Sequence, residues 1–194
     1  MADDRIKTVI FGGSFDPIHV GHITLAKEVI KQEIAQEVWF MVTPQNPHKR
    51  DKQLTDEKER LRMVQIAVEG EPRFQACDFE FSLPRPSYTL HTLNALEKKY
   101  PERKFILLVG ADNWEKFNSW YKGDEIVERF GLVVYPRDNE NTPSLPANVI
   151  WLKAQLCNVS STQIRNIIAS GDNASIFLPS GVNDYIIEKD LYKR

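Results

Sequence analysis

The sequence predicts an α/β fold: a doubly wound, mostly parallel sheet with helices on both faces. The first observation is a set of short apolar runs, which have the length and the β-branched or aromatic content of buried parallel strands. The second is that segments with a helical spacing of apolar residues separate these runs. Alternation of this kind is typical of parallel sheets with right-handed crossovers, where ligands bind at the carboxyl ends of the strands.

The expected elements follow one another along the whole chain. Apolar runs predict strands at residues 8–11, 38–42, 105–109 and 132–135. Helical periodicity predicts helices at residues 23–34, from a cap at Thr55 to about Val68, and at 88–100, 160–170 and 183–191. Two polar stretches that contain prolines, 43–54 and 137–148, are expected to be loops.

Length and charge limit the class of protein. A chain of 194 residues is long enough for one sizeable core, so we expect a single domain over 1–194, with a C-terminal helical portion from about residue 160. The 25 basic and 27 acidic residues leave a net charge of −2, which predicts no general attraction for nucleic acid or for an anionic membrane. The sequence leaves open whether the chain forms a homo-oligomer.

The N-terminus and the cysteines predict a soluble, cytoplasmic protein. Asp3, Asp4 and Arg5 precede the first expected strand without the apolar segment of a secretory signal, and no stretch approaches membrane-spanning length. Cys77 and Cys157 lack metal-ligand spacing, and two cysteines in a chain of this length do not make a disulfide framework. We therefore expect both thiols to be reduced and structural.

The main candidate for a functional site is the stretch at residues 12–22, GGSFDPIHVGH, directly after the first expected strand. Glycines let backbone N–H groups approach an anion closely, and His19 and His22 lie three residues apart at a helix start. The stretch has neither the P-loop pattern nor the GxGxxG pattern of dinucleotide-binding turns. A glycine pair after a strand is more often a plain tight turn, but glycines, Ser14 and two imidazoles in one window favour a phosphate site.

This stretch resembles the N-terminal motif of the nucleotidyltransferase superfamily that carries an HxGH element. Its Phe-Asp-Pro-Ile-His form is most similar to the bacterial nicotinate-nucleotide adenylyltransferases. The resemblance extends from Val9 through the helix after Ser160, and it implies a Rossmann-like nucleotidyltransferase fold. It also implies that His19 and His22 are catalytic residues, which contact the ATP phosphates and stabilise the charge that develops during adenylyl transfer.

A second motif, VSSTQIR at residues 159–165, is similar to the ISSTxIR motif of the family. From the residues alone, Ser160 and Gln163 fit a capping box that merely starts a helix. The two interpretations are compatible, because a capped helix N-terminus presents free N–H groups, and the hydroxyls and the guanidinium of Arg165 add further donors for polyphosphate. The resemblance implies that the β and γ phosphates bind here.

A third group begins with Gly110 and Asp112, at the end of an expected strand, and continues with aromatic residues. By their spacing alone, such aromatic residues more often belong to the core than to a ligand site. Asp112, however, follows the end of a strand, where doubly wound sheets hold their ligands. The family has a matching Gly-x-Asp and a Trp-Tyr pair whose Trp stacks on the pyridine ring, which implies that role for Trp120.

Two shorter segments also match the family. Residues 86–89 read PSYT, like the motif whose threonine contacts the mononucleotide, although alone they indicate only a helix start. Residues 46–49 read NPHK and resemble a Pro-Pro-His-Lys loop, in which the basic residue helps to hold substrate phosphate. Here the chain departs from the pattern, since Asn46 replaces a proline and Thr43 stands where the family has Asn.

Together the motifs imply two sets of binding residues. The set for ATP is Gly12, Gly13, Ser14, Phe15, His19, Gly21, His22, Gly110, Asp112, Ser160, Ser161, Thr162, Ile164 and Arg165. The set for nicotinate mononucleotide is Thr43, Lys49, Tyr88, Thr89, Asp112, Trp120 and Tyr121.

The reaction that the resemblance implies is adenylyl transfer from ATP to nicotinate mononucleotide, which gives deamido-NAD and pyrophosphate in NAD biosynthesis. The implied cofactor is Mg²⁺, held mainly by ATP phosphates and water and not by protein ligands. The alternatives are an adenylyltransferase for nicotinamide mononucleotide or phosphopantetheine, a cytidylyltransferase, and a catalytically silent nucleotide-binding sensor. The sequence does not decide between the acidic and the amidated mononucleotide.

Overall fold

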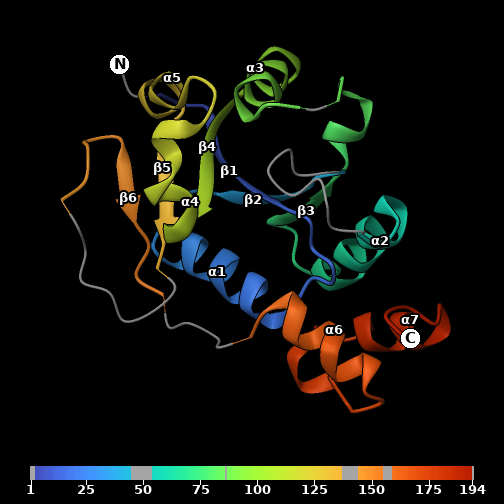
Figure 1. Cartoon of the computed structure of the whole chain (residues 1–194). Helices are drawn as coiled ribbons and strands as arrows, with labels where there is room; N and C mark the ends of the chain where they lie inside the picture. The colour runs from blue at the N-terminus through green and yellow to red at the C-terminus, as the bar shows by residue number, and fades with distance from the viewer. Residues whose placement is uncertain (1–2, 45–53, 86, 137–143, 155–158, 194) are drawn as a thin grey trace.

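The centre of the molecule is a six-stranded sheet in which every pairing is parallel (Figure 1). The computed structural model describes residues 3–44, 54–85, 87–136, 144–154 and 159–193. The strands are β1 (Ile6–Gly13), β2 (Glu37–Val42), β3 (Phe74–Cys77), β4 (Arg103–Gly110), β5 (Leu132–Tyr135) and β6 (Val149–Trp151). Their order, β3-β2-β1-β4-β5-β6, is that of a doubly wound sheet, so the predicted fold class is confirmed.

Helices cover both faces of this sheet, with α1 and α2 on one side and α3 and α5 on the other (Figure 1). The helices are α1 (Val20–Lys31), α2 (Glu57–Val68), α3 (Thr89–Lys99), α4 (Ala111–Glu115), α5 (Gly123–Arg129), α6 (Ser161–Ala169) and α7 (Val182–Glu188). Single 3-10 turns lie at Phe79–Ser82, Phe117–Ser119 and Ser175–Phe177. None of the described helices is long and apolar enough to span a bilayer.

Alternate residues of the central strands enter two separate hydrophobic cores. In β1, Val9 and Phe11 lie in the core shared with α1 and α2, whereas Ile10 lies in the core shared with α3 and α5. All three side chains are buried. Because both faces of the sheet are covered, the central strands are continuous apolar runs, which is why the sequence pattern predicted them.

The C-terminal portion predicted from about residue 160 packs into the first of these cores. Ile164 of α6 and Val182 of α7 are fully buried there. Figure 1 shows α6 and α7 side by side beyond the N-terminal end of α1. The last helix ends at Glu188, three residues before its predicted end, and Asp190 then takes a left-handed backbone with φ of 54°.

The sequence patterns did not predict β3, β6, α4 or α5. The two strands have four and three residues and form the two edges of the sheet, so they lack a long apolar run. The start of α5 carries no capping side chain: it follows Lys122, whose φ of 52° lies in the left-handed region. Periodicity over a few residues is too weak a signal to identify such elements.

Two predicted helix starts were wrong. The cap of α2 is Asp56 and not Thr55, because the Asp56 carboxylate accepts a hydrogen bond from the Lys58 N–H at 2.8 Å. Helix α1 spans Val20–Lys31 and not 23–34, because the extended backbone of His19 already acts as its N-cap.

Several expectations fall outside the described residues. Most of the loop at 43–54, most of the loop at 137–148, and Cys157 belong to this group. The other cysteine, Cys77, is free and buried, as expected of a structural thiol.

Candidate active site

The sheet reverses its direction of winding between β1 and β4. From β1 the chain builds β2 and β3 on one side, and it then crosses to build β4, β5 and β6 on the other. In doubly wound sheets, this reversal leaves a crevice at the carboxyl ends of the two central strands, where ligands bind. The glycine turn follows β1 and Gly110 ends β4, so two motifs far apart in the sequence lie at neighbouring strand ends.

The glycine turn at the end of β1 is open on one side and supported on the other. A Cβ atom added at Gly12 would meet no described atom within 4 Å, whereas one added at Gly13 would lie 3.0 Å from the Phe15 ring. That ring is buried and packs edge-on against Phe11, with the ring centroids 5.6 Å apart. The Phe15 side chain therefore supports the turn from the core, and the space beside Gly12 lets a phosphate approach the backbone.

His19 and His22 lie at the start of α1 with their rings stacked. The ring centroids are 3.7 Å apart, and the Nδ1 atom of His22 accepts a hydrogen bond from the backbone N–H of His19 at 3.2 Å. A neutral His22 must then carry its proton on Nε2, which makes that nitrogen a donor. The buried Nδ1 atom of His19 has no hydrogen-bond partner among the described residues. The pair therefore keeps hydrogen-bonding capacity for a ligand.

Burial keeps both imidazoles neutral near pH 7. It lowers the pKa of His19 from 6.5 to about 4. The pKa of His22 is held well below its ordinary value by burial and, second, by the neighbouring His19. A bound triphosphate would raise both values, because an adjacent anion favours the protonated form. The two side chains can thus donate hydrogen bonds as neutral groups and gain charge only when an anion is present.

We expect the ligand-free protein to lose stability as the pH falls from about 6.5 towards 4. The unfolded imidazole of His19 binds a proton near pH 6.5, whereas the folded one does so only near pH 4, so acid favours the unfolded chain in this window. For His19 alone the loss is roughly 3 kcal/mol. Urea unfolding of the wild type and of His19→Asn between pH 4 and 7.5 measures it. Equal pH dependence in the two proteins would contradict the assignment.

The start of α6 docks on the segment between the glycine turn and α1. The Oγ atom of Ser161 donates a hydrogen bond to the carbonyl oxygen of Pro17 at 2.9 Å, and Nη1 of Arg165 donates to that of Asp16 at 2.7 Å. Nη2 of Arg165 donates to the Thr162 hydroxyl at 3.3 Å. These bonds hold the N-terminus of α6 and the guanidinium of Arg165 beside the segment that precedes His19. The two groups form a second set of donors that can bind an anion.

The capping box predicted at Ser160 is confirmed. Its Oγ accepts a hydrogen bond from the Gln163 N–H at 3.3 Å, and Oε1 of Gln163 accepts one from the Ser160 N–H at 2.8 Å. Ile164 is fully buried, so its side chain anchors α6 in the core. Within the predicted ATP set, the side chains of Phe15 and Ile164 thus lie in the core, and Gly21 is buried in the first turn of α1.

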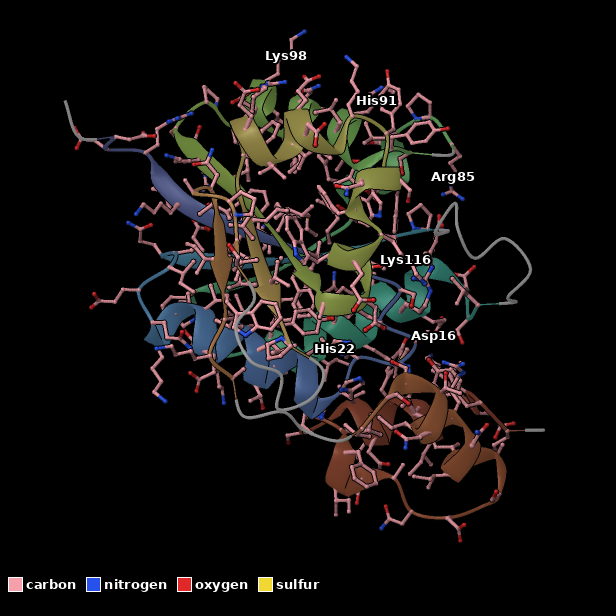
Figure 2. The ribbon with its side chains drawn as sticks, turned by 60° about the vertical axis from the view of Figure 1, so that its left-hand side comes forward. Asp16, His22, Arg85, His91, Lys98 and Lys116 are labelled. Carbon is pink, nitrogen blue, oxygen red and sulfur yellow. The ribbon has the colours of Figure 1, made fainter. Side chains whose placement is uncertain are left out.

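Three residues that the sequence did not single out lie at this site: Asp16, Arg60 and Tyr192. Oδ1 of the buried Asp16 accepts a hydrogen bond from the Tyr192 hydroxyl at 2.7 Å, which ties the C-terminal end to the segment before α1. Figure 2 shows Asp16 next to the C-terminal helices. Arg60 donates to the Ser14 carbonyl oxygen at 2.6 Å. No motif spacing marks these contacts, because the partners are 176 and 46 residues apart in the sequence.

The end of β4 leads into α4 and an aromatic group. Gly110 is the N-cap of α4, and Asp112 in its first turn is exposed. The ring of the half-buried Trp120 packs on that of the buried Phe117, with centroids 4.8 Å apart and an interplanar angle of 30°. The aromatic group therefore belongs partly to the core, as its spacing alone suggested, and Trp120 lies at the solvent side of that core.

The predicted mononucleotide residues come from several elements around the carboxyl ends of the strands. Tyr88 and Tyr121 are exposed, with ring centroids 5.1 Å apart, and His91 contacts both rings. Thr89 begins α3. The Thr43 N–H donates to the Gly13 carbonyl oxygen at 2.9 Å, which places the end of β2 beside the glycine turn. Lys49 lies outside the described residues. Figure 2 shows His91, Lys116 and Asp16 along the same side of the molecule.

Known proteins resemble this chain over nearly its whole length. The sequence profile of the Cytidylyltransferase-like family matches residues 10–167. The probable nicotinate-nucleotide adenylyltransferase of Bacteroides fragilis (strain YCH46) is 46% identical over 187 residues, which cover 95% of this chain and 93% of that protein. The protein of the same name from Geobacillus kaustophilus (strain HTA426) is 38% identical over 186 residues, which cover 96% and 86%.

The fold is also found in a solved structure. The structure of Plasmodium falciparum nicotinic acid mononucleotide adenylyltransferase complexed with NaAD matches with a TM-score of 0.79 at 20% identity, and the match covers 96% of this chain and 97% of that one. The family profile spans both the glycine turn and the start of α6. The chain therefore belongs to the Cytidylyltransferase-like family, among its nicotinate-nucleotide adenylyltransferases.

Proposed function

We propose that this protein transfers the adenylyl group of ATP to nicotinate mononucleotide, forming deamido-NAD and pyrophosphate, a step of NAD biosynthesis. The observation that carries the proposal is the stacked pair His19 and His22 at the start of α1, with the start of α6 docked beside it through Ser161 and Arg165. Relatives with this name are 46% and 38% identical to the chain.

The chemistry needs charge stabilisation more than acid–base catalysis. The nucleophile is the phosphate of the mononucleotide, which is largely ionised near pH 7 because its second pKa is about 6. One of its oxygens attacks the α-phosphorus of ATP in line, the bond to the bridging β-phosphate oxygen breaks, and pyrophosphate leaves with that electron pair. No general base is required, so the site contributes by aligning the two nucleotides and by donating hydrogen bonds to the phosphates.

The donors divide into two groups that act on the triphosphate. We assign the Nε2–H group of His22, with His19 and the backbone near Gly12, to the phosphates beside the glycine turn. Ser161, Thr162 and Arg165 at the start of α6 then bind the pyrophosphate portion. As negative charge moves onto the leaving group, both groups strengthen their hydrogen bonds, which lowers the barrier.

The mononucleotide would bind at the neighbouring strand ends. We assign Trp120 to the pyridine ring, since an electron-rich indole face suits an electron-poor ring, with Tyr121 and Tyr88 beside it. Thr89, Asp112 and Thr43 are the proposed polar contacts, together with Lys49 for the phosphate. We place the reaction in the cytoplasm, in keeping with the free thiol of Cys77.

Magnesium would enter the site with ATP. The described residues contain no group of three or more His, Cys, Asp and Glu side chains that converge on one point. The hydroxyls of Ser14 and Ser161 and the guanidinium of Arg165 would bind phosphate oxygens, while phosphate oxygens and water would hold the ion itself, as is usual for Mg²⁺ in phosphoryl transfer. When bound, the ion would offset negative charge on the phosphates.

Pyrophosphate release tests this function. The purified protein is given ATP, Mg²⁺ and one acceptor at a time: nicotinate mononucleotide, nicotinamide mononucleotide or phosphopantetheine. We expect the fastest release with nicotinate mononucleotide, equimolar with the dinucleotide formed. Release only with phosphopantetheine, or only when CTP replaces ATP, would assign a different transfer. ATP binding without release for any acceptor would indicate a nucleotide sensor.

A further inference from the structure

Arg60 of α2 is a buried cation at the back of the candidate active site. It is 1% exposed, although arginine is among the residues least often fully buried. The partners of its guanidinium are backbone carbonyl oxygens: Nη1 donates to Ser14 at 2.6 Å and to Thr43 at 2.9 Å, Nη2 to Pro44 at 3.1 Å, and Nε to Thr55 at 2.8 Å. Among the described residues, the acceptors of its hydrogen bonds are all backbone carbonyl oxygens, and the carboxylates of Asp16 and Glu57 attract the guanidinium without accepting one of these bonds.

These carbonyl groups belong to three different segments. Ser14 follows β1, Thr43 and Pro44 follow β2, and Thr55 lies before α2. Arg60 therefore joins the glycine turn after β1, which belongs to the proposed ATP site, to the end of β2, where Thr43 is a proposed contact of the mononucleotide. A planar guanidinium presents donors in a fixed fork, so it sets the directions of these carbonyl groups and not only their distance.

The direction of these carbonyl groups matters because the proposed ligand is a polyanion. A carbonyl oxygen carries partial negative charge, and a carbonyl aimed at the phosphates would repel them. In a planar trans peptide, the N–H group points away from the carbonyl oxygen. Because the Ser14 carbonyl oxygen accepts a hydrogen bond from Arg60, the Phe15 N–H of the same peptide unit points away from Arg60.

We propose that Arg60 is a positioning residue for adenylyl transfer: it turns the carbonyl groups behind the glycine turn and the β2 end inward and so keeps the crevice suited to phosphates. This inference rests on the proposed function. Arg60 itself does not touch the reacting atoms. It acts through the backbone of Ser14, Thr43 and Pro44.

Substitution at Arg60 separates this role from a purely structural one. Arg60→Lys keeps the charge and most of the volume but lacks the fork, whereas Arg60→Ala leaves a cavity that a guanidinium ion can enter. Arg62→Ala is the matched control, because Arg62 lies on the same helix, is exposed, and donates a hydrogen bond to the side chain of Gln65 at 3.4 Å. Thermal unfolding, kcat, KM for each substrate and the Kd of ATP are measured for every protein.

We expect Arg60→Lys to stay folded, to show a kcat lower by roughly 10- to 100-fold, and to bind ATP more weakly, because small displacements at an active site have effects of this size. We also expect a few millimolar guanidinium to restore part of the kcat of Arg60→Ala and to leave Arg62→Ala unchanged. A lower melting temperature with kcat and ATP affinity unchanged in Arg60→Lys would overturn the proposal, as would a folded Arg60→Ala that guanidinium does not rescue.

Measuring the affinity for ATP allows the role of Arg60 to be tested even if the protein does not catalyse the proposed reaction. If the wild type binds ATP but forms no dinucleotide, the proposed function fails. The inference about Arg60 is then decided by calorimetric titration of ATP into wild type and Arg60→Lys. Weaker binding to the variant supports the positioning role, and equal binding overturns it.

Discussion

The His22→Ala protein is expected to fold and to release pyrophosphate roughly 10²–10³ times more slowly than the wild type. An effect of this size, about 3–4 kcal/mol in the barrier, is usual when one preorganised donor is removed from a site where charge develops. His22 is such a donor because its Nδ1 is already engaged by the His19 N–H at 3.2 Å, which leaves the proton on Nε2. Single-turnover release at saturating ATP measures the effect without interference from product dissociation.

Two further substitutions at His22 separate catalysis from helix capping. In His22→Asn, the side-chain oxygen can take the place of Nδ1 and accept from the His19 N–H, but no donor remains at the position of Nε2. We expect this protein to be as slow as His22→Ala. In His22→Gln, the amide lies near the position of Nε2 and should recover part of the rate. Turnover close to that of the wild type in a folded His22→Asn protein would show that the Nε2–H group is not required.

Replacing Arg165 by alanine should lower kcat/KM for ATP by roughly 10²-fold or more. A hydrogen bond to a charged group contributes about 1.5–3 kcal/mol, and a guanidinium can make two such bonds to a phosphate. The same change removes the bond from Nη1 to the Asp16 carbonyl oxygen at 2.7 Å, which helps to hold α6 in place. Arg165→Lys keeps the charge without the fork, so we expect an intermediate rate.

Steady-state kinetics with ATP varied at saturating nicotinate mononucleotide measures the effect at Arg165. Arg129→Ala is the control, since Arg129 is exposed on α5 and pairs there with Glu97 and Glu125. Thermal unfolding of each protein shows how much of the effect comes from lost packing of α6. A kcat/KM for ATP within twofold of the wild type in Arg165→Ala would exclude this residue from the phosphate site.

An element is predicted clearly from the sequence when many of its neighbouring residues are under the same physical constraint. The middle residues of the central strands β1, β2 and β4 are buried on both faces, so successive residues there are under the same constraint and the apolar run is clear. The edge strands β3 and β6 are short and partly exposed, and only some of their residues carry that constraint. The capping box at Ser160 was predictable because both of its hydrogen bonds connect residues three positions apart.

The same reasoning applies to the candidate site. His19 and His22 are neighbours on one turn of a helix, so their spacing alone predicted that both would face one ligand, and their rings are stacked 3.7 Å apart. The role of Phe15 was not evident in this way: its motif position suggested a ligand contact, but its side chain supports Gly13 from the core. A sequence motif identifies the residues of a site but does not show which of their side chains face the ligand.

The sequence by itself determined the fold class, the central strands, the glycine turn, the paired histidines and the family, because these depend on neighbouring residues or on motifs with fixed spacing. Only the tertiary structure decided how the turn is held. The carboxylate of Asp16 accepts a hydrogen bond from Tyr192 at the C-terminal end, and Arg60 donates hydrogen bonds to backbone carbonyl groups after β1 and β2. Such contacts join segments that only folding brings together, and their acceptors are often backbone carbonyl groups, which every residue possesses. No pattern of side chains along the chain can therefore specify them in advance.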